Sequence, residues 1–149
     1  MEPVAALERR FGGPAVAVYG RWVLMARPKA LSLGSLVVAG RGGETAFSAL
    51  PDAAFAEYAT VIRDVEAALG AAVAPARVNY VMLMLVEPWV HFHAFPRYAG
   101  ERAGGGLSLP DLCWPDPPVL AAARDLAPEA LVPYARWLAG HWPDAVRAR

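Results

Sequence analysis

Residues 88–97, which read PWVHFHAFPR, contain two of the three histidines of the chain and decide how its fold is interpreted. Apolar residues alternate with the two histidines between flanking prolines, a pattern that predicts a β-strand over residues 90–95. Because residues two apart on a strand share a face, His91 and His93 are predicted to project from one side, about 7 Å apart along the strand. Trp89 is expected on that side as well.

The segments before this strand predict an α+β domain built on an antiparallel sheet. The expected strands span residues 15–19, 22–26, 35–39, 78–85 and 90–95, with a hairpin turn at Gly20-Arg21 between the first two. The expected helices span residues 3–11 and 52–69. The second of these is the clearest, because Pro51 suits a helix start, apolar residues recur at steps of three and four from Phe55 to Leu69, and Gly70 is a stop signal.

The last third of the chain has a different composition. Residues 99–118 are rich in glycine and proline and are predicted to be loop, whereas residues 119–126 and 128–142 have helical composition. Gly104–Gly106 lacks the Lys-Ser/Thr ending of a phosphate-binding P-loop, so a flexible linker is the favoured interpretation. No internal repeat or second domain is indicated, and residues 1–149 are predicted to form one domain.

Composition narrows the classes of function. The 14 basic and 14 acidic side chains cancel, which argues against a non-specific nucleic-acid binder but is compatible with a small anionic ligand. No apolar run reaches the length of a membrane span, and residues 1–4 lack the pattern of a secretory signal. The single cysteine, Cys113, fits a reducing compartment. We therefore expect a soluble cytoplasmic protein.

Paired imidazoles on one strand face suit chemistry at phosphorus. One ring can attack as a neutral nucleophile, and the other can neutralise phosphate charge or protonate a leaving group. Two other interpretations stay open at this point. The pair can be two partly exposed strand residues without a catalytic role, or it can ligate zinc with a third ligand from His141, Cys113 or Asp111.

The same motif resembles that of the histidine triad (HIT) family, in which His-x-His-x-His is followed by two apolar residues and often by Pro-Arg. When the Pro-Arg dipeptides are aligned, the middle and third family histidines correspond to His91 and His93, and Trp89 occupies the first position. The likeness covers about residues 15–98 and leaves residues 99–149 as a C-terminal extension.

This resemblance implies an α+β fold with about five antiparallel strands and one main helix, assembled as a homodimer. It implies a nucleotide hydrolase or nucleotidyl transferase that acts at the α-phosphate of a dinucleoside polyphosphate or a nucleoside phosphoramidate. His91 is expected to be the nucleophile that carries the nucleotidyl group, and His93 is expected to bind the phosphates. No resident cofactor or metal is expected, and magnesium is expected only as a companion of the substrate phosphates.

Three further residues are predicted to bind substrate. Arg27 stands where many family members have an Asp or Asn that holds the ribose, and Asn79 resembles a family Asn or Gln that contacts phosphate. Trp89 offers a stacking or blocking surface in place of a histidine. The departures at Arg27 and Trp89 favour an alternative function, a nucleotide-binding or sensing module of the same fold with little or no turnover.

Overall fold

A computed structural model describes all 149 residues and centres on one antiparallel sheet. Its five strands lie in the order β1-β2-β4-β6-β5, and each pairs antiparallel with its neighbours. Their bounds are Ala15–Val18 for β1, Trp22–Ala26 for β2, Leu36–Gly40 for β4, His91–Arg97 for β6 and Arg77–Val81 for β5. The predicted α+β class, the five strands and the hairpin between β1 and β2 are confirmed.

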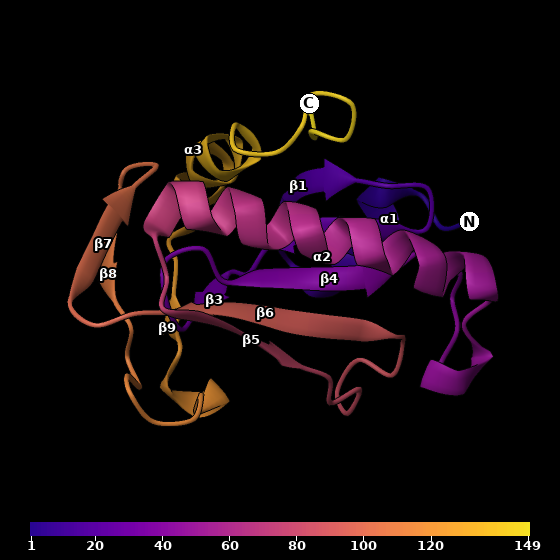
Figure 1. The fold of residues 1–149 in the computed structure, drawn as a ribbon, viewed down its shortest axis with the longest axis horizontal. Coiled ribbons are helices and arrows are strands. Elements are labelled where there is room, and N and C mark those ends of the chain that lie inside the picture. The colour runs from indigo at the N-terminus through magenta and orange to yellow at the C-terminus, as the bar shows by residue number, and fades with distance from the viewer.

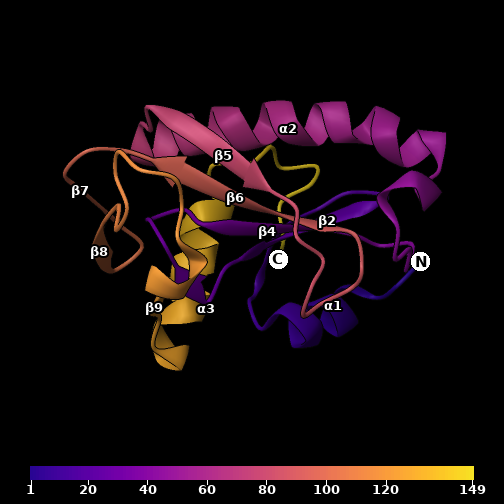
Figure 2. The same ribbon diagram turned by 90° about the horizontal axis from the view of Figure 1, so that it is seen from below.

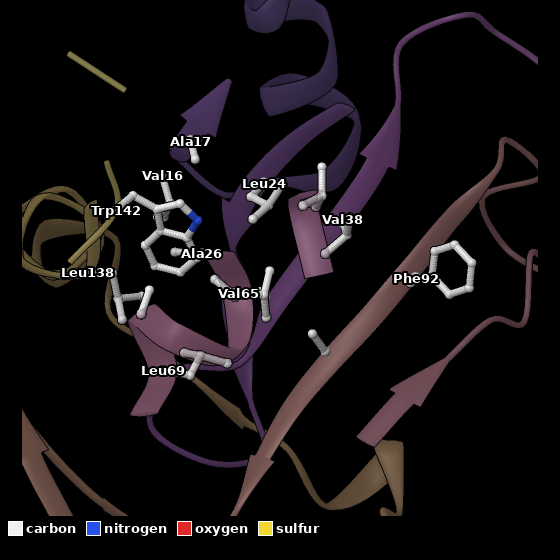
Figure 3. Packing of buried hydrophobic residues seen from close by; sticks show 14 of the residues in the cluster. Val16, Ala17, Leu24, Ala26, Val38, Val65, Leu69, Phe92, Leu138 and Trp142 are labelled. Carbon is white, nitrogen blue, oxygen red and sulfur yellow. The ribbon is translucent and has the colours of Figure 1, made fainter. Parts of the chain in front are cut away.

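Helices cover both faces of this sheet. The long helix α2 (Asp52–Val73) runs along one face, and the short helix α1 (Val4–Phe11) lies on the other (Figure 2). Helix α3 (Pro128–Ala139) joins α2 in covering the first face, where 27 buried residues form the main core. Figure 3 shows Val65 and Leu69 of α2 packed beside Leu138 and Trp142 of the C-terminal segment. None of the helices combines the length and the apolar character that crossing a membrane requires.

The second face carries much less apolar packing. A cluster of five buried residues lies there beneath α1: Leu7, Val23, Met25, Val37 and Ala39. The remainder of this face borders a pocket. The sheet therefore packs against a large core on one face and lines a pocket with the other.

Helix α2 extends past the predicted stop. Gly70 lies inside it, and the helix ends at Val73, followed by Ala74 in a left-handed conformation with φ 45°. A glycine costs about 1 kcal/mol in a helix interior relative to alanine. The burial of Val73, which is 2% exposed, offsets that cost. The predicted apolar stripe is also partly wrong, since Phe55 is 43% exposed.

The segment predicted as loop and linker contains a hairpin. Strands β7 (Glu101–Gly104) and β8 (Leu107–Pro110) pair beside the C-terminal end of α2 (Figure 1), where Arg102 donates to the Val73 carbonyl. A side chain at Gly104 would overlap the Trp137 indole. The glycines therefore allow the turn to pack against α3 and do not form a flexible linker.

Residues 119–126 do not form the predicted helix. They contain a single 3-10 turn, Leu120–Ala122, and a short strand β9 (Arg124–Asp125) that pairs with β3 (Lys29–Ala30). Lys29 pairs with Asp125 and Ala30 with Arg124, so the backbone of this segment is extended where a helix was expected. A second 3-10 turn, Phe47–Ala49, precedes α2.

The boundaries of the two strands nearest the motif differ from prediction. Strand β5 ends at Val81, and the segment 82–90 forms a loop that reaches toward α1 (Figure 2). Met84 in this loop has φ 55°, which is incompatible with a continuing strand. Trp89 lies in the same loop, before the first residue of β6. The apolar run favours a core strand in the sequence because periodicity alone does not distinguish core residues from those that line a pocket.

Candidate functional site

Strand β6 places both motif histidines on the second face of the sheet. His91 pairs with Ala39 and His93 with Val37 on the neighbouring strand β4. Phe92 alternates with them and points into the main core. The two imidazole rings are perpendicular, with centroids 5.1 Å apart. They line one pocket, as the spacing of the motif predicted.

The His91 ring is fixed by its own loop. Its Nδ1 lies 2.7 Å from the carbonyl oxygen of Trp89, so Nδ1–H is the donor and Nε2 carries the lone pair. The ring also packs against Phe11 of α1, at a centroid distance of 4.9 Å, and is 4% exposed. This is the tautomer that a nucleophilic imidazole requires, with the distal nitrogen unprotonated.

The His93 ring is held in the opposite tautomer. Arg27 donates its Nε–H to Nδ1 of His93 at 3.3 Å, so the ring proton resides on Nε2. Burial, the nearby positive charge of Arg27 and the His91 ring, in decreasing order, together lower the pKa of His93 to about 4. His93 is therefore a neutral N–H donor at physiological pH.

The Arg27 side chain is held in position by the Lys29 carbonyl and the Phe95 ring. Its guanidinium donates to the carbonyl oxygen of Lys29 and lies 5.4 Å from the Phe95 ring centroid. Burial lowers the pKa of Arg27 from its ordinary value, yet an arginine remains protonated at neutral pH. The predicted substrate-binding residue Arg27 thus reaches the pocket as a cation bound directly to one motif histidine.

The pocket has a volume of about 500 Å³ and two contrasting walls. The β-sheet and α1 supply cations and imidazoles, whereas the loop after β5 supplies a continuous apolar wall. The lining residues are Arg10, Phe11, Arg27, Pro28, Lys29, Val37, Leu83, Met84, Leu85, Val86, Glu87, His91, His93 and Leu120. Such a combination suits a ligand with an anionic group and an apolar or aromatic body.

Two predicted substrate residues do not line this pocket. Trp89 packs its ring beneath the guanidinium of Arg10, which lies 3.7 Å from the ring centroid. Asn79 lies on the pocket face of the sheet opposite Phe95, but its Oδ1 accepts a hydrogen bond from Arg97 at 2.8 Å. The structure therefore brings together His91, His93 and Arg27, and leaves these two residues in the surrounding shell.

Arg97 is part of a buried network. Its Nε donates to Asp111 at 2.7 Å, and its Nη2 donates to the Asp116 carbonyl at 2.6 Å. The side chains of Arg97 and Asp111 are 4% and 0% exposed. This ion pair connects the segment after β8 to the end of β6. The arginine of the Pro-Arg dipeptide is therefore bound to Asp111.

The three residues considered as additional zinc ligands do not join the motif histidines. Asp111 is engaged by Arg97, His141 Nδ1 lies 3.0 Å from the Trp137 carbonyl oxygen, and Cys113 Sγ accepts from the Val119 N–H. No group of three His, Cys, Asp or Glu side chains in the chain has an arrangement that would hold a metal ion. The zinc interpretation therefore lacks its third ligand.

Several pocket residues were not foreseen from the sequence. Arg10 and Phe11 come from a helix that lies some 80 positions before the motif, and no local pattern links the two segments. Residues 83–85 belong to the strand predicted over residues 78–85, and Val86 follows it. Leu85 is 79% exposed and Val86 is 92% exposed, which is unusual for apolar residues. The sequence does not indicate this exposure, because it results from the loop that these residues form.

Comparison with solved structures identifies the architecture. No protein-family model and no curated protein sequence matches the chain. A hypothetical histidine triad nucleotide-binding protein from Sulfolobus tokodaii superposes with a TM-score of 0.67 at 16% identity, covering 93% of this chain and 89% of that one.

Two rhizobial structures agree with that match. A histidine triad protein from Sinorhizobium meliloti gives a TM-score of 0.63 at 17% identity, over 95% of this chain and 97% of that one. A histidine triad protein from Bradyrhizobium japonicum gives 0.63 at 18% identity, over 88% and 94%. These matches cover 88–95% of this chain, so they extend beyond the region around the motif into much of residues 99–149. The chain thus has the fold of the histidine triad proteins, as the motif of residues 88–97 predicted.

Proposed function

We propose that this protein binds a nucleotide conjugate and cleaves or transfers it at the α-phosphate through a covalent nucleotidyl-His91 intermediate. The observation that carries the proposal is the hydrogen bond from His91 Nδ1 to the Trp89 carbonyl at 2.7 Å, which leaves Nε2 with its lone pair. Similarity to structures described as histidine triad proteins, one of them as nucleotide-binding, supports the ligand class.

In the first step the Nε2 lone pair of His91 forms a bond to phosphorus while the bond from phosphorus to the leaving group breaks. The leaving group takes the electron pair and a proton from solvent. The imidazole becomes cationic, and its Nδ1–H bond to the Trp89 carbonyl strengthens because charge-assisted hydrogen bonds are stronger than neutral ones. Water then forms an O–P bond and releases a proton to solvent, while the N–P bond breaks and its electron pair returns to Nε2. The nucleoside monophosphate leaves, and His91 is neutral again.

His93 acts as a neutral donor in this scheme. Its Nε2–H is available for a non-bridging phosphate oxygen because Arg27 occupies Nδ1. The Arg27 cation, coupled through the His93 ring, favours the negative charge that accumulates on those oxygens. Magnesium, where required, is carried by the substrate phosphates.

The test is turnover of dinucleoside polyphosphates and nucleoside phosphoramidates, followed as release of nucleoside monophosphate. His91→Ala is expected to lower kcat by roughly 10³-fold or more, as loss of a nucleophile does. His141→Ala is the matched control, since His141 lies in the C-terminal segment outside the pocket and should leave turnover unchanged. Quenching under alkaline conditions, which preserve N–P bonds, should reveal a nucleotidyl adduct that His91→Ala lacks.

The second candidate function is a nucleotide-binding module without turnover. The 4% exposure of His91 beneath Phe11 favours it, because an attacking ring must meet the phosphorus centre directly. Calorimetric binding of nucleotides with no release of monophosphate from either substrate class, and with unchanged affinity in His91→Ala, would support the module and reject the covalent mechanism.

We also propose, from the HIT resemblance, that the protein is a homodimer. Sedimentation of the purified chain tests this assembly.

A further inference from the structure

Arg10 is a pocket cation that the proposed chemistry at His91 does not use. It stands in the last turn of α1, next to Phe11, whose ring packs on His91. Its side chain is 15% exposed and lines the same pocket as the two histidines. Arg27 contacts His93, whereas Arg10 lies on the side of His91, so the two guanidinium groups flank the histidine pair.

The guanidinium of Arg10 is fixed by two contacts. Its Cζ lies over the Trp89 ring, 3.7 Å from the ring centroid, and its Nη1 and Nη2 donate to the Glu2 carboxylate at 3.0 and 2.5 Å. The hydrogen bond from Arg10 lowers the pKa of Glu2, so this carboxylate is ionised at neutral pH. Glu2 takes two of the five N–H donors of Arg10, and no other residue accepts from the remaining three.

Trp89 connects this arginine to the candidate nucleophile. Its backbone carbonyl accepts from His91 Nδ1, and its ring supports Arg10. A single residue therefore sets both the tautomer of the attacking ring and the position of a neighbouring cation. A histidine in this position would offer a smaller ring and, when protonated, would repel the guanidinium.

We propose that Arg10, positioned by Trp89, is a specificity-determining residue that binds a phosphate beyond the one adjacent to His91. The protein then prefers nucleotide ligands with two or more phosphates over monophosphate ligands with an uncharged leaving group. This inference rests on the proposed function, because it assumes that the α-phosphate lies at His91. A planar guanidinium with free N–H groups is well suited to phosphate oxygens, and contact with an indole holds it in place without neutralising its charge.

Glu2 opposes this binding in the free protein. Its carboxylate occupies one edge of the guanidinium in the bidentate geometry that a phosphate would adopt. A ligand phosphate either shares Arg10 with Glu2 through the three free donors or displaces it. Removing the negative charge of Glu2 should therefore strengthen polyphosphate binding.

The experiment is calorimetric binding of AMP, ADP and ATP without magnesium, so that charge on the ligand is not masked. The wild-type protein is expected to bind ATP more tightly than AMP. Arg10→Gln should weaken ATP binding by about tenfold, the value of one to two lost charge-assisted hydrogen bonds, and leave AMP affinity unchanged. Arg9→Gln is the matched control, because Arg9 is the adjacent arginine of the same helix, is exposed, and does not line this pocket.

Variants of the two supporting residues refine the test. Trp89→Leu should reduce the ratio of ATP to AMP affinity, and Trp89→Phe, which keeps an aromatic face, should largely restore it. Glu2→Gln should raise that ratio. Circular dichroism of each variant establishes that the fold is retained.

The outcomes separate this inference from the proposed function. AMP binding that depends on His93 but shows no loss of ATP preference in Arg10→Gln overturns the role of Arg10 alone. An equal loss of AMP and ATP affinity in Arg10→Gln also overturns it, because the residue then contacts the common part of the ligand. Failure of the wild-type protein to bind any of the three nucleotides overturns both proposals.

Discussion

On the face of the sheet covered by α2 and α3, strand β6 contributes Phe92 and Ala94 to a core of 27 buried residues. On the opposite face the same strand contributes His91 and His93 to a pocket. The alternation of side chains along the β-strand thus places one set in the core and the other set in the pocket. The core packs behind the backbone of β6 and holds it in place, whereas the tautomers of the two imidazoles are set by the Trp89 carbonyl and the Arg27 guanidinium.

The largest stability effect is expected on the core face. Phe92 stacks on Tyr58 at 5.0 Å and lies within 6.2 Å of the Trp22 ring centroid. Phe92→Ala removes these contacts and leaves a cavity, and should lower the free energy of unfolding by about 3–5 kcal/mol in urea denaturation. His91→Ala, one position away, should change it much less while abolishing turnover. Equal destabilisation by the two substitutions would remove the distinction between the faces.

A second comparison concerns the two classes of ion pair in the C-terminal third. Asp111→Ala leaves the buried Arg97 cation without a partner and should destabilise the protein by about 3–5 kcal/mol. Asp144→Ala breaks the Arg147–Asp144 pair, whose side chains are 38% and 88% exposed, and should cost under about 1 kcal/mol. Thermal or urea unfolding of both variants measures the contrast. A small effect of Asp111→Ala would mean that water reaches Arg97 in the folded protein.

The pocket face should make stability depend on pH. The pKa of His93 is about 4 in the folded protein and 6.5 in the unfolded chain, with Arg27 and His91 as its charged or titratable neighbours. Between these values the unfolded chain binds a proton that the folded protein does not, so stability falls as the pH falls from about 6.5 to about 4. His93→Gln removes this contribution, and its urea midpoint should decline less over that range. Parallel declines in the two proteins would contradict the low pKa of His93.

The smallest effect is expected on the solvent side of α2. Gly70 lies inside the helix, and a Cβ built there meets no atom within 4 Å. Gly70→Ala should therefore stabilise the protein by about 0.5–1 kcal/mol, since alanine restricts the unfolded chain and favours the helix. Gly104→Ala is the contrasting substitution, because its Cβ would overlap Trp137 and should destabilise. Differential scanning calorimetry of the two variants resolves the opposite signs.

Local sequence patterns were sufficient for much of the fold and for the heart of the site. Strand alternation fixed the common face of His91 and His93, and the period of apolar residues located α2. Patterns failed where an apolar run had two possible uses. Residues 83–86 satisfy the pattern of a core strand equally well, yet they line the pocket. Strand β5 lies at the edge of the sheet with β6 as its one neighbour, and β6 begins only at His91.

What the sequence alone determined is the pair of imidazoles on one strand face, because a period of two is a property of the backbone and needs no long-range contact. The tertiary structure decided which ring nitrogens carry protons and which residues contact the two rings. The Trp89 carbonyl, the Arg27 guanidinium and the Arg10–Glu2 pair come from separate segments that meet only when α1 and the loop before β6 close over the sheet. Tautomer and pKa depend on such neighbours and on burial, and neither is encoded in local spacing.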